Sequence, residues 1–323
     1  MVKDVLLSVQ DLKKYFSTSS GKLHAVDGVT FDIKRGTTLG VVGESGCGKS
    51  TLGRVILHLI PRTSGEIIFE EEDISDVSSK RLHELRRYMQ IIFQDPFSSL
   101  DPRQTVSNII GEPLSIHKMV RNSEDYIKRV REVMDIVGLA RRLENSYPHE
   151  LDGGRRQRIG IGRALMLNPK FIVCDEPVSA LDVSIQAQIL NLMQDLQKER
   201  QLTYMFITHN LAVVKHISNE IIVMYLGMIV EKAETKELFQ NQYHPYTKAL
   251  ISAIPRIKTE KRQERIILKG EITSPINPPD ACRFANRCVY AQEKCFCCAP
   301  KAEEVTPKHI VACHYAKEIN GLN

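Results

Sequence analysis

The chain has 323 residues, of which 42% are hydrophobic and 26% charged, as in globular proteins, so extensive disorder is not expected. The net charge of +5 comes from 44 basic and 39 acidic residues without a long basic run, which argues against a nucleic-acid partner. The start, MVKDVLLSVQDLKKYF, lacks the pattern of a signal peptide, and no apolar run approaches the ~20 residues of a membrane span. We therefore expect a cytoplasmic chain that reaches a membrane only through a partner.

The first 40 residues predict strands, because residues 5–9 and 29–33 are short apolar or β-branched runs. A buried strand is then predicted at 38–42, followed by a glycine-rich turn and a helix from 49 to about 59 that Pro61 ends. This order of strand, glycine loop and helix is the context that a phosphate-binding loop requires.

The glycine-rich turn matches the pattern G-x-x-x-x-G-K-S/T at every fixed position. Its glycines let backbone N–H groups point at phosphate oxygens, and the helix that follows adds its positive end. Lys49 would contact the β- and γ-phosphates of ATP, and Ser50 would bind Mg²⁺. The residues predicted to bind the nucleotide in this loop are Gly43, Glu44, Ser45, Gly46, Cys47, Gly48, Lys49, Ser50 and Thr51.

Residues from about 98 to 164 show helical periodicity and predict a helical insertion. Its expected packing stripe consists of Ile127, Val130, Val133, Met134 and Val137.

The chain then returns to alternating strands and helices. The continuous apolar run 171–174 predicts a parallel strand buried on both faces, followed by a helix at about 184–197 and a strand at 204–207. Asp175 and Glu176 come directly after the first of these strands. Asp175 would hold Mg²⁺, and Glu176 would polarise the attacking water as general base.

Further motifs carry a family resemblance. Residues 151–158, LDGGRRQR, resemble the L-S-G-G-Q-x-Q-R signature of ABC ATPases. In the same order as in that family, Gln94 resembles the Q-loop glutamine, Asp182 ends a D-loop (179–182) and His209 resembles the switch histidine. Tyr15 lies where the family has an aromatic side chain against adenine.

This resemblance implies an α/β fold of the P-loop NTPase class. It implies a RecA-like core with a parallel sheet, an N-terminal antiparallel β subdomain, a helical subdomain inserted at about 98–165 and a small cysteine-rich C-terminal extension. The expected domains are an ATPase domain at 1–255 and the extension at 256–323.

The resemblance also implies that two ATPase domains face each other, with each ATP between one subunit's phosphate loop and the other's signature. Glu176, Gln94 and His209 would then be catalytic, and Ser50, Gln94 and Asp175 would hold Mg²⁺. The residues implied for the composite ATP site are Asp152, Gly153, Gly154 and Asp182.

The signature departs from the family pattern at two positions. Asp152 replaces the family's serine, and Arg155 replaces its glutamine. Because a carboxylate near a γ-phosphate is repulsive, we hypothesise that the composite site using this signature is weaker. The alternative is that Asp152 is a tolerated variant.

Two runs are similar to those of dipeptide and oligopeptide importer ATPases: FQDPFSSLDPR at 93–103 and HPYTKAL at 244–250, the latter followed by AIP at 253–255. They imply a second, homologous ATPase, two membrane permeases that dock at the Q-loop and helical subdomain, a peptide-binding protein, and a peripheral position on the cytoplasmic face of the plasma membrane. Nickel, glutathione and oligosaccharide importers share these marks, so their ATPases are alternatives. Non-transport ABC ATPases are disfavoured, because the chain lacks their coiled coil or second phosphate loop.

The tail, which follows a proline-rich linker at 275–279, contains six of the eight cysteines. In the peptide-importer family, cysteines that match four of them imply a 4Fe–4S cluster. Zinc is an alternative, although zinc sites use tighter cysteine pairs, and free or disulfide-bonded cysteines are another. The four candidate ligands are Cys282, Cys288, Cys295 and Cys313; Cys297 and Cys298 fall outside the pattern.

Overall fold

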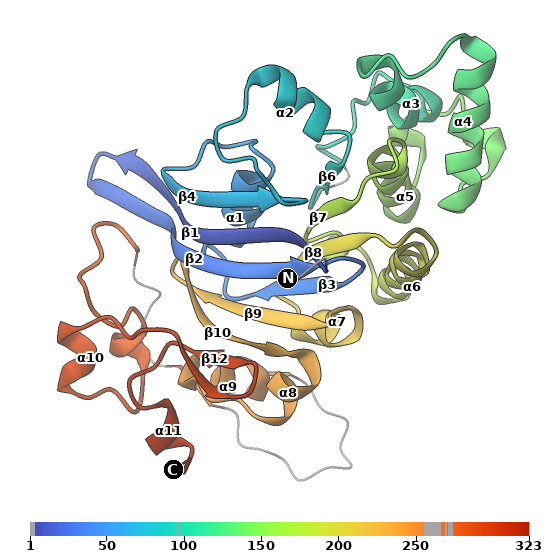
Figure 1. Ribbon diagram of the computed structural model, residues 1–323. Coiled ribbons are helices and arrows are strands. Elements are labelled where there is room, and N and C mark those ends of the chain that lie inside the picture. Colours follow the sequence, from blue (N-terminus) through green and yellow to red (C-terminus); the bar gives the residue numbers. More distant parts are fainter. Residues whose placement is uncertain (1–3, 96, 255–265, 269, 271–273, 323) are drawn as a thin grey trace. The chain divides into compact units, whose positions relative to one another are not determined.

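The computed structural model describes residues 4–95, 97–254, 266–268, 270 and 274–322 (Figure 1). Pro96 and Pro255, which belong to the importer-like runs, lie outside the described residues. The chain folds into two compact units. The first comprises residues 1–33, 38–75 and 207–323, and the second comprises 34–37 and 76–206.

The first unit begins with an antiparallel sheet in the order β2-β1-β4-β5, which confirms the predicted N-terminal β subdomain (Figure 1). Leu7 pairs with Phe69 and Val9 pairs with Ile67, and all four side chains are buried. The first two strands extend far beyond the predicted runs. Their bounds are β1 Val5–Thr18, β2 Gly21–Lys34, β4 Ser64–Phe69 and β5 Glu72–Asp73.

The first unit also contains strands in the order β11-β12-β10-β9-β3. β3 is parallel to β9, and the other neighbours are antiparallel. β3 has its predicted bounds, and all five of its residues are buried. The elements are β3 Thr38–Val42, α1 Lys49–Ile56, α7 Leu211–Ile217, β9 Glu220–Tyr225, β10 Met228–Glu234, α8 Thr235–Gln240, α9 Pro245–Ser252, α10 Glu293–Cys297, β11 Glu303–Thr306, β12 His309–Val311 and α11 Ala316–Ile319.

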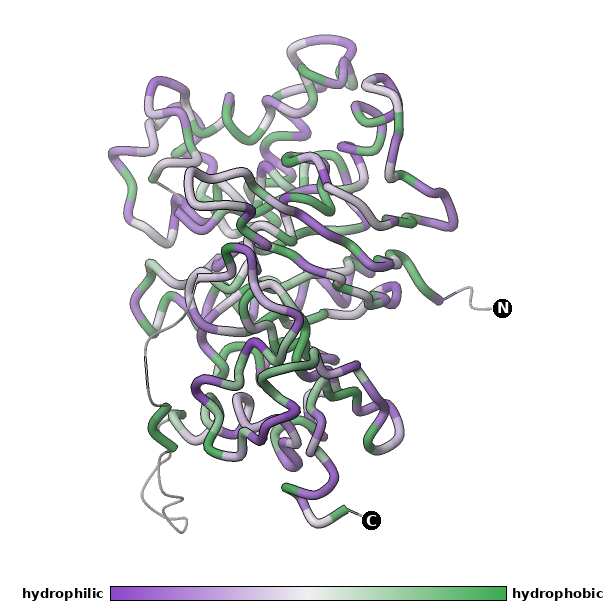
Figure 2. Tube along the Cα trace, turned by 90° about the vertical axis from the view of Figure 1, so that its left-hand side faces the viewer, coloured by the Kyte–Doolittle hydropathy of each residue, from purple (hydrophilic) through white to green (hydrophobic). Residues whose placement is uncertain are grey.

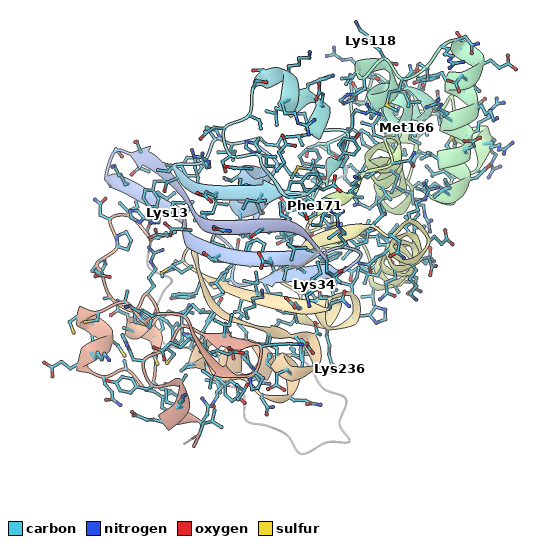
Figure 3. All side chains as sticks on the ribbon, viewed as in Figure 1. Lys13, Lys34, Lys118, Met166, Phe171 and Lys236 are labelled. Carbon is cyan, nitrogen blue, oxygen red and sulfur yellow. The ribbon has the colours of Figure 1, made fainter. Side chains whose placement is uncertain are left out.

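The second unit combines three strands, in the order β8-β7-β6, with the predicted helical insertion. β6 and β7 are parallel, and Phe171 at the start of β7 is fully buried (Figure 3). The elements are α2 Ser79–Leu85, β6 Met89–Ile92, α3 Val106–Ile116, α4 Ser123–Ile136, α5 Gly153–Leu165, β7 Phe171–Asp175, α6 Val183–Arg200 and β8 Thr203–Ile207.

Two local predictions were wrong. Helix α1 ends at Ile56 rather than at about residue 59, because His58 adopts a left-handed φ of 52° before Pro61 is reached. Ile127 is 44% exposed, whereas Val130 and Met134 are buried. Its side chain lies at the N-terminal end of α4 and lines a cavity of about 560 Å³ instead of the helix interface.

A buried carboxylate of β10 anchors the tail to the rest of the first unit. Glu231 on β10 is 0% exposed; its Oε1 accepts a hydrogen bond from Tyr243 N at 2.7 Å and lies 2.8 Å from His309 Nε2 on β12. Its Oε2 accepts one from His244 N at 3.2 Å. One carboxylate therefore joins β10, β12 and the start of α9.

None of the helices in the described part of the chain is both long enough and apolar enough to span a membrane. Hydrophobic and hydrophilic residues are interspersed along the trace (Figure 2).

Because removing a buried carboxylate leaves its hydrogen-bond partners at Tyr243 N, His244 N and His309 unsatisfied, we expect Glu231→Ala to lower the Tm of the full chain by roughly 10 °C. Lys308→Ala is the control, since its ion pair with Glu234 at 3.3 Å is exposed and should change the Tm by less than about 2 °C. Thermal unfolding of both variants measures the difference, and equal Tm values would contradict the anchor.

Candidate nucleotide-binding site

The phosphate-binding loop leaves the end of β3 and enters α1 through glycines that no other residue can replace. Gly48 is the N-cap of α1 with φ 103°, and a Cβ there would lie 2.0 Å from the Ala25 carbonyl oxygen. At Gly43, with φ 155°, a Cβ would lie 2.2 Å from the Met224 carbonyl oxygen. Both the left-handed backbone and the close neighbours therefore require glycine.

Lys49 is only 5% exposed, and its ammonium group lies within the loop. Its Nζ donates hydrogen bonds to the carbonyl oxygens of Gly43 and Glu44, each at 2.9 Å. Burial raises the pKa of the neighbouring Cys47 thiol, so it stays protonated at neutral pH. The loop's own carbonyl groups therefore hold Lys49, and its contact with the β- and γ-phosphates stays a prediction.

Glu44 is held by two residues that the sequence did not single out. The Glu44 N–H donates to Tyr246 Oη at 2.9 Å, which fixes the start of the loop. Its carboxylate receives two hydrogen bonds from Arg287, at 2.6 and 3.1 Å. Arg287 is 243 positions away in the chain, so no local pattern signals this contact.

Tyr15, the predicted adenine contact, belongs to a network centred on Asp27. The Tyr15 hydroxyl donates to Asp27, and its ring stacks on His24 with centroids 3.9 Å apart. Arg283 from the tail donates to Asp27 and to the Leu226 carbonyl oxygen. Burial works to raise the pKa of Asp27, but hydrogen bonds from Tyr15 and His24 and the charge of Arg283 hold it below its ordinary value.

The predicted acidic pair lies in the second unit, at the carboxyl end of β7. Asp175 is the last residue of β7 and is 1% exposed. The next residue, Glu176, has a left-handed φ of 47°, so the chain turns out of the strand direction there. Gln94 Nε2 donates to Glu176 Oε2 at 3.2 Å. The structure therefore brings together the predicted Q-loop glutamine and general base, which are 82 positions apart.

Asp182, the predicted D-loop aspartate, is the N-cap of α6. Its Oδ1 accepts hydrogen bonds from Ile185 N at 3.0 Å and from the Ser184 hydroxyl at 2.7 Å. These bonds lower the pKa of Asp182, with the Ser184 hydroxyl contributing most. This geometry gives Asp182 a local role in the helix that the motif alone did not indicate.

Asp152 is the N-cap of α5, which carries the signature residues. Its Oδ1 accepts a hydrogen bond from Arg155 N at 2.8 Å, and its Oδ2 lies 3.5 Å from Arg155 Nε. Aspartate and serine cap helices about equally well, so the exchange preserves the start of the helix. Gly154 packs tightly, because a Cβ there would lie 2.7 Å from the Ile185 side chain.

The remaining predicted residues lie in these same elements. Ser50 and Thr51 are in the first turn of α1, Ser45 and Gly46 are exposed at the tip of the loop, and His209 follows β8 and is exposed. Gly153 begins α5.

The four predicted cysteine ligands lie in the tail, where sulfur atoms are drawn in yellow in Figure 3. Burial, together with the charges of neighbouring cysteines, raises the pKa of Cys282 and of Cys313 to about 11 each. Among the described residues, however, no three His, Cys, Asp or Glu side chains lie close enough together to hold one metal ion. Cys297 and Cys298 are exposed, with their sulfur atoms 3.6 Å apart.

Comparisons with known proteins show which family contains this combination of elements. Residues 26–179, which include both the phosphate loop and the acidic pair, match the family described as ABC transporter. Residues 230–295 match the family described as oligopeptide/dipeptide transporter, C-terminal region. The oligopeptide transport ATP-binding protein AppF of Bacillus subtilis is 50% identical over 97% of this chain and 98% of its own length. The chain belongs to the ABC transporter ATPase family.

Other members support the same conclusion for this ABC ATPase. The dipeptide transport ATP-binding protein DppF of Haemophilus influenzae is 47% identical over 96% of each chain. Among solved structures, the ATP-binding cassette MJ0796 bound to ADP and Pi matches with a TM-score of 0.66 and 28% identity, covering 71% of this chain and 99% of that one. CbiO1 of Clostridium perfringens, part of an ABC transporter complex, matches with the same TM-score and 30% identity, covering 74% and 92%. These matches confirm the predicted P-loop NTPase fold.

Capping of α5 gives a stability prediction. Asp152→Ala removes the acceptor for Arg155 N and should lower the Tm by about 3 °C, whereas Asp152→Ser keeps an acceptor and should leave it unchanged. Thermal unfolding of the two variants beside the unchanged chain measures this. A similar loss in both would mean that the carboxylate does more than cap the helix.

Proposed function

We propose that this ABC ATPase hydrolyses ATP to power the import of di- and oligopeptides. The observation that carries the proposal is the similarity to peptide transport ATP-binding proteins over nearly the whole chain, including the C-terminal region. The alternative is that this chain is the ATPase of a nickel, glutathione or oligosaccharide importer.

The proposed chemistry assigns one role to each motif. Lys49 contacts the β- and γ-phosphates, while Ser50, Gln94 and Asp175 hold Mg²⁺. Glu176 polarises the attacking water, and its hydrogen bond from Gln94 supports that role because it orients the carboxylate. His209 stabilises charge on the transferred phosphate.

We further propose that a second, homologous ATPase faces this chain, so that Asp152, Gly153, Gly154 and Asp182 contact the ATP bound by that partner. The dimeric state of the structural relative MJ0796 supports a facing arrangement. Asp152 would then repel the partner's γ-phosphate. Because serine also caps the helix, Asp152→Ser isolates this effect and should raise the ATPase activity of the full complex; unchanged activity would make Asp152 a tolerated variant.

Two permeases are the proposed membrane partners, on the cytoplasmic face of the plasma membrane. Phe97 supports a contact beside the Q-loop, because this aromatic side chain is 59% exposed three residues after Gln94. Its ring is covered on one face by Arg156, 4.0 Å from the ring centroid. Delivery of cargo by a peptide-binding protein completes the proposed importer.

The cysteine tail is proposed to hold a 4Fe–4S cluster rather than zinc. Besides burial, the charges of Cys288 and Cys295 contribute to the raised pKa of both Cys282 and Cys313, and the wide spacing of the four cysteines along the chain differs from the tighter pairs of zinc sites. The cluster would tie the short tail together.

The import proposal is tested with the assembled transporter in membrane vesicles. Glu176→Gln should reduce ATP hydrolysis at least about 100-fold and abolish uptake of a labelled oligopeptide, because the general base is lost. Glu303→Gln, a change at an exposed carboxylate of the tail, should alter neither. Uptake of nickel or an oligosaccharide instead of peptides would contradict the proposed substrate class.

The cluster is tested by metal analysis of anaerobically purified chain. We expect about four irons per chain and a visible absorbance band, both lost in Cys288→Ser because one ligand is removed. Cys297→Ser should retain both. A colourless, zinc-containing protein would contradict the cluster.

A further inference from the structure

The carboxylate of Glu44 places a negative charge in the phosphate loop. Glu44 directly follows Gly43 in a loop that binds a highly negative triphosphate, and like charges at short range repel. Its side chain is 25% exposed, so water screens the charge only in part. Without a neighbouring cation, this carboxylate would oppose nucleotide binding.

Arg287 supplies that cation. It donates two hydrogen bonds to the two carboxylate oxygens of Glu44, at 2.6 and 3.1 Å, a geometry that fixes the orientation of the carboxylate as well as its charge. The side chain of Arg287 is 8% exposed. Its guanidinium lies 5.9 Å from the ring centroid of Tyr225, whose own ring packs edge-on against Tyr246. Tyr246 in turn accepts the hydrogen bond from Glu44 N, so one cluster holds both the backbone and the side chain of Glu44.

A second arginine of the same segment reaches the other end of the nucleotide site. Arg283 donates to Asp27, which also accepts a hydrogen bond from the Tyr15 hydroxyl. It also donates to the carbonyl oxygen of Leu226, and the next residue, Gly227, donates its N–H to the Cys47 carbonyl oxygen at 2.9 Å. Arg283 therefore touches both the support of Tyr15 and the turn that rests on the phosphate loop.

The segment that carries both arginines is itself compact. It runs from Cys282 to Cys288 and contains a 3₁₀ turn, Ala285–Arg287. Phe284 is 2% exposed and packs edge-on against Tyr225, with ring centroids 5.2 Å apart. The Cys282 N–H donates to the Cys295 carbonyl oxygen at 2.9 Å. A compact segment with two arginine side chains that are each only 8% exposed can position what those arginines hold.

We propose that segment 282–288 positions the nucleotide: Arg287 neutralises and orients Glu44 beside the phosphates, and Arg283 holds Asp27 and, through it, Tyr15 beside the base. Both arginines are positioning residues, since each acts through another side chain. The inference concerns nucleotide affinity: it rests on the proposed ATP site and not on the transported substrate, and Cys282 and Cys288, which bound the segment, are two of the proposed cluster ligands.

The central experiment measures the Kd for Mg-ATP by titration calorimetry on the full-length chain. Arg287→Ala should raise the Kd about tenfold, because the carboxylate of Glu44 is left uncompensated. Arg287→Lys should raise it less, because the charge remains while the paired hydrogen bonds are lost. Arg141→Ala is the matched control: Arg141 also makes two hydrogen bonds to one carboxylate, that of Asp135, but in the second unit, and the Kd should not change.

Rescue distinguishes charge neutralisation from a purely structural role. In a Glu44→Gln background, the Kd of Arg287→Ala should lie within about twofold of that of the unchanged chain, because the carboxylate that Arg287→Ala leaves uncompensated is then gone as well. If the tail were merely detached, the loss would persist in that background, and the proposal would be overturned. An unchanged Kd in Arg287→Ala itself would also overturn it; if that variant fails to fold, Arg287→Gln, which also removes the charge, and its combination with Glu44→Gln decide in the same way.

Inorganic tripolyphosphate separates the two arginines, because it has phosphates but no base. Arg287→Ala should weaken binding of both Mg-ATP and Mg-tripolyphosphate, whereas Arg283→Ala should weaken binding of Mg-ATP more than that of Mg-tripolyphosphate. Equal weakening of both ligands by Arg283→Ala would refute the link from Arg283 to Tyr15.

Discussion

The backbone of the phosphate loop lies so close to two other backbone segments that no side chain fits between them. Gly48 faces the Ala25 carbonyl and Gly43 faces the Met224 carbonyl, and a Cβ at either position would overlap an oxygen. This close approach ties the loop between β3 and α1 to β2 and to the end of β9. The N–H groups of the loop therefore keep a fixed direction, which an anion-binding site requires.

Charge is the second constraint on this site. The loop contains a buried lysine and a partly exposed glutamate, and each is fixed by partners of its own. Lys49 is held by two loop carbonyls, whereas Glu44 is held by Arg287 from the tail. The tail is joined to β10 through Glu231, and it supplies Arg283 to Asp27. The C-terminal region therefore belongs to the same compact unit as the phosphate loop.

The signature region shows how a change of residue type can preserve structure while altering charge. Asp152 caps α5 as a serine would, so the exchange does not change where the helix starts. Asp182 caps α6 in the same way. Residues assigned to ATP contacts thus also define the ends of their helices, and stability measurements are needed to separate the two roles.

The sequence by itself determined the fold class, the two halves of the ATP motif and the strand at 38–42, because glycine loops, apolar strands and carboxylates at strand ends are local patterns. It could not determine where α1 ends, that the Ile127 side chain is exposed, or where the tail strands lie, since these features depend on packing against distant residues. Tertiary structure alone decided that Arg287 meets Glu44 and that Arg283 meets Asp27, across 243 and 256 positions. No local pattern encodes such pairs, because only the folded chain brings their charges together.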